Sequence, residues 1–191
     1  MSYYIYIIMN STQNGSLHLI LGPMFSGKTT KIIDLYNNYI SNNQNVAVIN
    51  YIGDKRYHDY KLSTHDNVMI DCINTECITD VLNLPIIEQA NIILINEGQF
   101  FKDIFETTLQ LVEQLNKTVH ICGLDGDFKR NKFGRLLELI PFCDTVEKLH
   151  SICNNCKKPA LFSFRVSNET GQVVIGNQNY IPLCRICYCN M

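Results

Sequence analysis

"LHLILGPMFSGKTT", residues 17–30, holds the pattern that decides the fold. Residues 17–21 are an apolar run, which predicts a short buried strand ending at Gly22. Residues 22–29 match the phosphate-binding pattern G-x-x-x-x-G-K-S/T at every position, and apolar residues then recur at helical spacing as far as Ile40. Because a strand leads into this loop and a helix leads out of it, as the motif requires, the stretch predicts a nucleotide-binding fold of the P-loop type.

The residue types in this loop suit the binding of a nucleotide phosphate chain. Glycine at positions 22 and 27 allows the backbone to wrap around phosphate oxygens with its N–H groups pointing inward. Lys28 can reach the β- and γ-phosphates, the hydroxyl of Thr29 can bind Mg²⁺, and the following helix adds the positive end of its dipole. The expected nucleotide-binding residues are Gly22, Pro23, Met24, Phe25, Ser26, Gly27, Lys28 and Thr29.

Further apolar strands alternate with helices along the chain, which implies a parallel sheet with right-handed crossovers. The fold class expected for the core, residues 17–148, is therefore α/β. Residues 52–70 are polar and rich in turn residues, without clear periodicity. The expected strands cover 46–51, 91–96 and 118–125, and the expected helices cover 103–115 and 135–142, the second broken near Pro141.

Two later segments narrow the class of P-loop protein. In "IILINEGQFF", residues 92–101, a buried strand runs directly into Glu97, and a carboxylate in that place is typical of a catalyst or a neighbour of a metal ion. A guanine-specific GTPase would usually carry N-K-x-D after a later strand. Here Asn116 and Lys117 precede the strand, and Val119 stands in the Asp position, which disfavours a GTPase.

Composition excludes several other classes. The 191 residues suit one domain, or one domain with a small appendage. The net charge is −2, and binding to nucleic-acid phosphates needs a basic surface, so no nucleic-acid partner is expected. No apolar run reaches the roughly 18 residues of a membrane span, so no membrane partner is expected. Residues 1–16, which lack the features of a signal peptide, are expected to form a tail or a peripheral strand.

The cysteines indicate a metal site. Their number, nine, is odd and nothing suggests secretion, which disfavours a disulfide framework and favours a reducing compartment. The pairs Cys153/Cys156 and Cys184/Cys187 form CxxC…CxxC, which can supply four thiolates to a structural Zn²⁺ with no open position. Residues 149–191 are therefore expected to form a zinc-binding module. The segments between the pairs, 160–167 and 172–176, predict two strands joined by a turn.

These features, in this order, resemble the type II thymidine kinases, the zinc-containing family of cells and large DNA viruses. The resemblance covers nearly the whole chain from Leu17 to Tyr188. The phosphate loop is specific alone, whereas the later pieces are specific as an ordered set. These pieces are "GDKRYHDYKLSTHD", "NEGQFFKDI", "GLDGDFKRNKFG", "VVIG" followed by Tyr180, and "CRICY".

The resemblance implies transfer of the γ-phosphate of ATP, bound with Mg²⁺, to the 5′-hydroxyl of thymidine. It implies that Glu97 is the general base, that Lys28 and Thr29 hold phosphate and magnesium, and that Arg56 lies near the transferred phosphate with Asp54 beside it in the substrate site. Asn96 and Gln99, which flank the base in the sequence, are assigned to the nucleotide site.

The resemblance also implies a thymine pocket covered by a loop of the zinc module. The expected pocket walls are Met24, Phe100, Leu124, Phe128 and Phe133, and the expected covering residues are Gln172, Val173, Val174, Ile175, Gly176 and Tyr180. Further implications are a homotetramer, inhibition by dTTP at the substrate site, and a cytoplasmic location, in the host cytoplasm if the protein is viral.

The chain departs from the family pattern in three places. Asn96 stands where aspartate is usual, Gln172 stands where valine is usual, and the stretch between Gly176 and Tyr180 is about one residue short.

Two other classes of protein stay open from the residues alone. One is another P-loop phosphotransferase with a zinc lid, such as a nucleoside monophosphate kinase, although those lids usually interrupt the core. The other is a non-catalytic P-loop and zinc-ribbon protein that binds nucleic acid or a partner.

Overall fold

The structure, a computed structural model, describes residues 14–53, 61–63, 68–174 and 176–191. Its centre is a six-stranded sheet in which every neighbouring pair of strands is parallel. This confirms the α/β class and the parallel sheet that the alternation of strands and helices predicts. In order across the sheet, the strands are β5 (Ile73–Thr75), β2 (Val46–Tyr51), β6 (Ile92–Asn96), β7 (Thr118–Gly123), β1 (Ser16–Leu21) and β8 (Thr145–Lys148).

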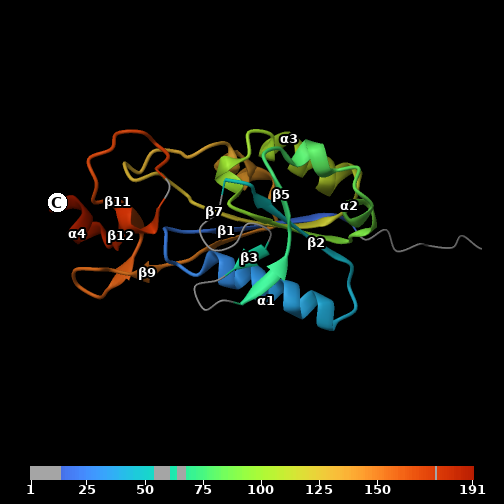
Figure 1. Ribbon diagram of the computed structural model, residues 1–191, viewed down its shortest axis with the longest axis horizontal. Helices are drawn as coiled ribbons and strands as arrows, with labels where there is room; N and C mark the ends of the chain where they lie inside the picture. The colour runs from blue at the N-terminus through green and yellow to red at the C-terminus, as the bar shows by residue number, and fades with distance from the viewer. Residues whose placement is uncertain (1–13, 54–60, 64–67, 175) are drawn as a thin grey trace, which may run out of the picture.

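Helices cover both faces of this sheet, as Figure 1 shows for α1 on one side and α3 on the other. On the first face, Ile32 and Ile33 of α1 (Lys28–Ser41) pack in one buried cluster with alternate strand residues such as Leu94. The residues of opposite parity, such as Ile93 and Ile95, pack in a second cluster on the other face. The helices of that second face are η1 (Ile78–Val81), α2 (Pro85–Gln89), α3 (Ile104–Leu109), η3 (Gln110–Gln114) and η4 (Leu136–Phe142).

The local geometry differs in places from the sequence-based expectation. The expected helix over 103–115 is present, but its second half, η3, is a π-helix, and the expected helix over 135–142 is the 3₁₀-helix η4 with Pro141 inside it. Two short antiparallel strands, β3 (Lys61–Ser63) and β4 (Met69–Asp71), lie within a region whose sequence predicts no strand. In the described part of the chain, no helix is long and apolar enough to cross a membrane.

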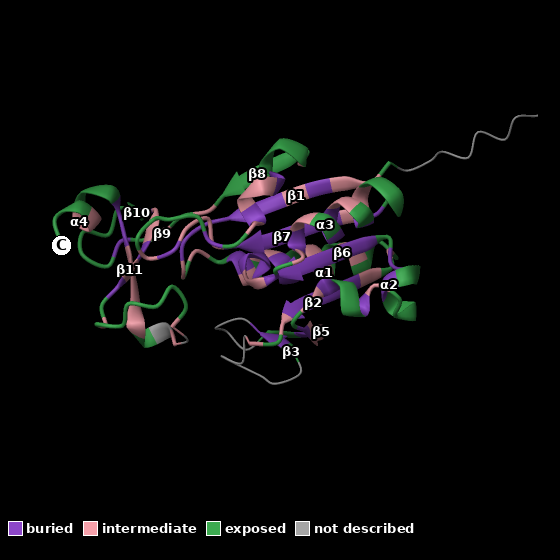
Figure 2. Ribbon diagram, turned by 90° about the horizontal axis from the view of Figure 1, so that it is seen from above, coloured by how far each residue is buried: buried purple, intermediate pink, exposed green. Residues whose placement is uncertain are grey.

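The C-terminal module lies beyond one end of the sheet (Figures 1 and 2). The expected strand over 172–176 is wrong for residues 172–174, which lie in a loop. The antiparallel partner of β11 is instead β12, which begins at Tyr180. The module consists of β9 (Ser151–Ile152), β10 (Pro159–Ala160), β11 (Phe162–Arg165), η5 (Asn177–Asn179), β12 (Tyr180–Leu183) and α4 (Arg185–Cys189).

Two histidines lie side by side on neighbouring strands of the sheet, His120 buried and His18 half-buried. His18 of β1 and His120 of β7 are opposite each other in the parallel register, and their rings stack with centroids 4.5 Å apart. Tyr39 of α1 lies 2.8 Å from Nε2 of His120 through its hydroxyl oxygen. Burial, and to a smaller extent the neighbouring His18, lower the pKa of His120 to about 4. His120 is therefore neutral in the folded protein at neutral pH.

This pKa predicts that acid destabilises the fold through His120. In the unfolded chain the pKa of His120 returns to about 6.5. At a pH between about 4 and about 6.5, His120 is therefore protonated in the unfolded chain and neutral in the folded chain. The free energy of unfolding should therefore decrease as pH falls from about 6.5 toward 4, by at most about 1.4 kcal/mol per pH unit from this residue. Urea unfolding at pH 7 and pH 5.5 should show a shallower dependence in His120→Gln than in the wild type, with His150→Gln as the control. Equal dependence in all three proteins would contradict this assignment.

Candidate active site

A cavity of about 290 Å³ opens where the strands of the parallel sheet end. Residues 24–29 of the phosphate loop and Glu97 line it together with residues from the C-terminal module. Ligands commonly bind at this edge of open α/β sheets. Of the expected thymine-pocket and covering residues, the cavity brings together Met24, Phe100, Leu124, Phe128, Phe133, Gln172, Val173, Val174, Gly176 and Tyr180.

The phosphate loop has the backbone conformation of an anion cradle. Phe25 and Gly27 both have left-handed φ angles, 62° and 83°, so the chain wraps tightly before α1 begins at Lys28. The ammonium group of Lys28, which is only 8% exposed, donates a hydrogen bond of 2.7 Å to the carbonyl of Pro23. A charged side chain, backbone N–H groups and the positive end of α1 therefore meet in one loop, which suits nucleotide phosphates.

Glu97 is buried and held in one orientation. It follows β6 with a left-handed φ of 57° and is 7% exposed. Strained backbone of this kind is concentrated at functional sites. Gln99, in the 3₁₀ turn η2 (Gly98–Phe100), donates a hydrogen bond of 2.6 Å from Nε2 to Oε2 of Glu97. The backbone N–H of Leu124 donates a hydrogen bond of 2.9 Å to Oε1 of Gln99, which fixes the amide and, through it, the carboxylate.

Aromatic rings form one wall of the cavity. Phe100 stacks on Tyr51 with ring centroids 5.0 Å apart and meets Phe133 edge-on at 5.2 Å. Offset and edge-on arrangements of this kind are the favourable ones for aromatic pairs. Tyr51, at the end of β2, was not among the residues expected from the sequence. Its position after an apolar run, at the carboxyl end of a parallel strand, was the available signal.

Arg165 organises the module's loop over this wall. Its guanidinium donates hydrogen bonds to the backbone carbonyls of Glu169, Gly171 and Gln172 and to the hydroxyl of Tyr180. It also lies over the ring of Phe128, 3.7 Å from the ring centroid, so it connects the module with the core. Arg165, which is 5% exposed although it is charged, was not among the site residues expected from the sequence.

Several expected site residues are not among those shown to line the cavity. Gly22, Pro23, Asn96 and Gln99 are not among the residues that line the cavity. Asp54, Arg56 and Ile175, as well as residues 1–13 of the expected N-terminal tail, are outside the described part of the chain.

Asn96 belongs to a row of polar side chains across the sheet. Its Nδ2 donates a hydrogen bond of 2.8 Å to Oδ1 of Asn50, and its Oδ1 accepts one of 3.0 Å from the thiol of Cys122. Asn50 in turn donates a hydrogen bond of 2.9 Å to Oδ1 of Asn74. These residues come from the neighbouring strands β7, β6, β2 and β5, so the row ties the carboxyl ends of four strands together.

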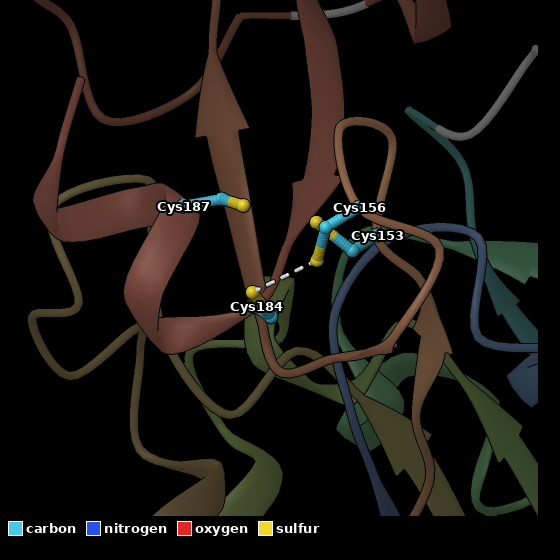
Figure 3. A group of neighbouring side chains, drawn as sticks. All are labelled: Cys153, Cys156, Cys184 and Cys187. Carbon is cyan, nitrogen blue, oxygen red and sulfur yellow. Dashed lines mark hydrogen bonds between the residues drawn. The ribbon is translucent and has the colours of Figure 1, made fainter.

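The four cysteines of the two expected pairs form one cluster (Figure 3). Their sulfur atoms all lie within 4.8 Å of one another, and those of Cys156 and Cys184 are 3.5 Å apart. Burial alone would raise the pKa of Cys153, but N–H groups of the backbone at Cys156 and Cys184 hold it at about 6. Hydrogen bonds to the sulfurs of Cys156 and Cys184 raise the pKa of Cys187 to about 12. Four sulfurs at this spacing, one of them easily ionised, fit a structural Zn²⁺.

The fold and the cavity define this chain as a P-loop nucleotide-binding protein with a Cys₄ module. A family model described as "Thymidine kinase" matches residues 15–188. The chain is 39% identical over 175 residues to the thymidine kinase of Myxoma virus (strain Uriarra), which covers 91% of this chain and 96% of that protein. It is also 34% identical over 182 residues to thymidine kinase a of Arabidopsis thaliana, which covers 92% of this chain and 75% of that protein. The chain belongs to the thymidine kinase family.

The contacts of Asn96 predict the effect of replacing it with aspartate. In Asn96→Asp, the carboxylate has no hydrogen to donate to Oδ1 of Asn50, and Asn50 cannot turn its amide without losing its bond to Asn74. The variant should therefore unfold with a free energy about 1–3 kcal/mol lower than the wild type. Urea unfolding at neutral pH measures this, with the exposed Asn37→Asp as the control. A variant as stable as the wild type would show that the row is not a structural tie.

Proposed function

We propose that this chain transfers the γ-phosphate of ATP to the 5′-hydroxyl of thymidine. Membership of the thymidine kinase family supports this proposal. The single structural observation that carries it is the composition of the cavity, which is lined by the phosphate loop, by the buried carboxylate of Glu97 and by the aromatic wall. The phosphate loop can hold the phosphates of the donor, Glu97 can accept a proton, and the aromatic wall can pack against the flat face of the base.

The chemistry follows from these groups. The 5′-oxygen of thymidine attacks the γ-phosphorus, the bond to the oxygen between the β- and γ-phosphates breaks, and ADP leaves. Glu97 accepts the proton of the hydroxyl group as the new bond forms. Lys28 neutralises charge on the phosphates, and Arg56 is proposed for the same task at the transferred group. Mg²⁺, when bound with ATP through the hydroxyl of Thr29, supplies further charge neutralisation.

Two residues assigned to the nucleotide site receive different roles from their contacts. We propose that Gln99 positions Glu97 and does not touch the nucleotide, because both ends of its amide are engaged within the protein. We propose that Asn96 fixes the end of β6, which Glu97 directly follows, because its amide donates a hydrogen bond to Asn50 and accepts one from the thiol of Cys122.

Further proposals concern the organisation of the chain and its location. The two cysteine pairs and the change in sequence near residue 148 support a core over residues 17–148 and a zinc module over residues 149–191. A homotetramer and a cytoplasmic location rest on the resemblance to the family. Inhibition by dTTP is a further proposal, since dTTP carries the same base and deoxyribose as thymidine and can occupy the same cavity.

The reaction is tested by offering several acceptors to the purified protein with ATP and Mg²⁺. Thymidine, deoxycytidine, deoxyuridine, dTMP and AMP distinguish a thymidine kinase from a nucleoside monophosphate kinase and from a non-catalytic protein. Phosphorylation of thymidine, without comparable phosphorylation of dTMP or AMP, is the expected result. Transfer to a monophosphate instead, or no transfer at all, would contradict the proposal.

The role of Glu97 predicts the kinetics of Glu97→Gln. This change keeps the shape of the side chain but removes the proton acceptor, so kcat should fall by about 10²–10⁴-fold while ATP binding persists. The control is Glu147→Gln, which alters an exposed carboxylate on β8. Turnover of Glu97→Gln close to the wild-type rate would show that another group is the base.

A further inference from the structure

The core loop 127–132 contributes Asp127 to the lining of the cavity and is held in shape by hydrogen bonds within the loop. Asp127, which is 7% exposed, accepts hydrogen bonds of 2.8 Å at Oδ1 from the backbone N–H groups of Lys129 and Asn131. The backbone N–H of Asp127 also donates to the carbonyl of Asn131. One oxygen of the carboxylate thus shapes the loop, and the other oxygen, Oδ2, points away from these bonds toward the module's loop.

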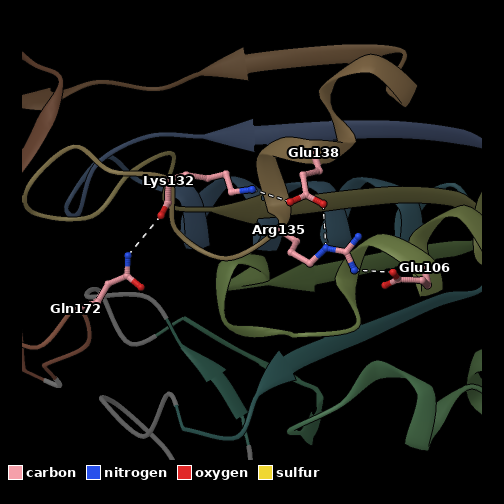
Figure 4. Close-up of polar contacts among 5 residues, drawn as sticks. All are labelled: Glu106, Lys132, Arg135, Glu138 and Gln172. Atoms are coloured by element: carbon pink, nitrogen blue, oxygen red, sulfur yellow. Dashed lines mark hydrogen bonds and ion pairs between the residues drawn. The ribbon is translucent and has the colours of Figure 1, made fainter.

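An ion-pair network anchors the far end of the same loop (Figure 4). Lys132 bonds Oε1 of Glu138 at 2.6 Å, and Arg135 bonds Oε2 of the same carboxylate at 2.9 Å. Arg135 also bonds Glu106 of α3 at 2.5 Å. The side chain of Lys132 therefore contacts η4, which Arg135 joins to α3. The loop offers two acceptors to the module, Oδ2 of Asp127, which lines the cavity, and the carbonyl of Lys132.

The module presents one amide to these two acceptors. Arg165 holds the backbone of Gln172 by a hydrogen bond of 2.9 Å to its carbonyl. From there, Nε2 of Gln172 donates one hydrogen bond of 2.9 Å to Oδ2 of Asp127 and a longer one of 3.4 Å to the carbonyl of Lys132. Among the described residues, two hydrogen bonds join residues 169–174 to the core, and the side-chain amide of Gln172 donates both of them.

We infer that Gln172 is a positioning residue for the phosphorylation of thymidine, whose side-chain amide holds the loop 169–174 closed against the core loop 127–132. The inference rests on the proposed function, in which this loop covers the base. We call the contacts of Gln172 with Asp127 and Lys132 the Gln172 bridge. The bridge acts on substrate binding and not on the transfer step, because Gln172 joins the covering loop to the core, and among the described residues its side chain bonds Asp127 and Lys132 and not Glu97.

The chemistry of the bridge requires a hydrogen-bond donor at position 172. Burial alone would raise the pKa of Asp127, but the hydrogen bonds from Gln172 and from the backbone N–H groups lower it overall, so Asp127 is ionised at neutral pH. An amide supplies two hydrogens to a carboxylate and a carbonyl. A carboxylate at position 172 would supply none and would place two like charges together.

Kinetics of three variants test the bridge. Gln172→Glu should raise KM for thymidine by about 3- to 30-fold, with kcat and KM for ATP close to the wild-type values. Gln172→Met, which keeps the length but lacks the donor, should raise KM less. Adding Asp127→Asn to Gln172→Glu should recover much of the lost affinity, because the new amide can donate to the new carboxylate while its oxygen still accepts from Lys129 and Asn131. Gln178→Glu, an exposed residue of η5 outside the cavity lining, is the matched control.

The outcomes separate this inference from the proposed function. If the wild type phosphorylates thymidine and Gln172→Glu has an unchanged KM, the bridge is wrong and the proposed function stands. Additive effects in the double variant would also overturn the bridge, since residues in direct contact show a coupling that independent sites lack. Hydrogen exchange gives a second measurement that does not depend on turnover. The backbone N–H groups of residues 169–174 should exchange faster in Gln172→Met than in the wild type, whereas those of residues 118–123 should exchange at the same rate in both proteins. An unchanged rate in residues 169–174 of the variant would overturn the inference.

Discussion

All six strands of the central sheet run in the same direction, and this constraint determines where the chemistry lies. In a parallel sheet, every loop that follows a strand leaves at the same edge. Groups that are far apart in the sequence therefore converge on one cavity. They are the phosphate loop after β1, Tyr51 at the end of β2, Glu97 after β6 and Leu124 after β7. The row from Cys122 through Asn96 to Asn50 connects the carboxyl ends of β7, β6 and β2.

The sheet edge forms only part of the cavity, and the module supplies the rest. The Cys₄ cluster joins two segments that are remote in sequence, one before β10 and one at the start of α4. Between them lie β11 and β12, whose pairing positions Arg165 and Tyr180 under the covering loop. Contacts thus run continuously from the cysteine cluster to the hairpin, then to Arg165, and finally to the loop that Gln172 connects to the core.

Much of this arrangement was predictable from sequence, because its determinants are local. The strand, loop and helix around Lys28 and the two CxxC pairs need only short-range spacing, and the structure confirms both. The contacts of Asn96 were not predictable, because its bond to Asn50 depends on the register of β6 against β2. The apolar run after Gln172 was expected to form a strand. Its described residues, Val173 and Val174, lie in a loop instead. Arg165 engages the backbone carbonyls of Glu169, Gly171 and Gln172 just before them, and no neighbouring sequence reveals that contact.

The central proposal is that the phosphates bind at the carboxyl ends of the strands, whereas binding of the thymine base depends on the module that the Cys₄ cluster holds together. Titrating ATP and thymidine separately into the protein before and after removal of zinc by a chelator tests this most directly. Circular dichroism would confirm that the sheet persists, and Cys189→Ser would serve as a control that keeps the Cys₄ cluster. The account predicts that the zinc-free protein retains ATP binding and loses thymidine binding. Unchanged thymidine affinity in zinc-free, folded protein would contradict it.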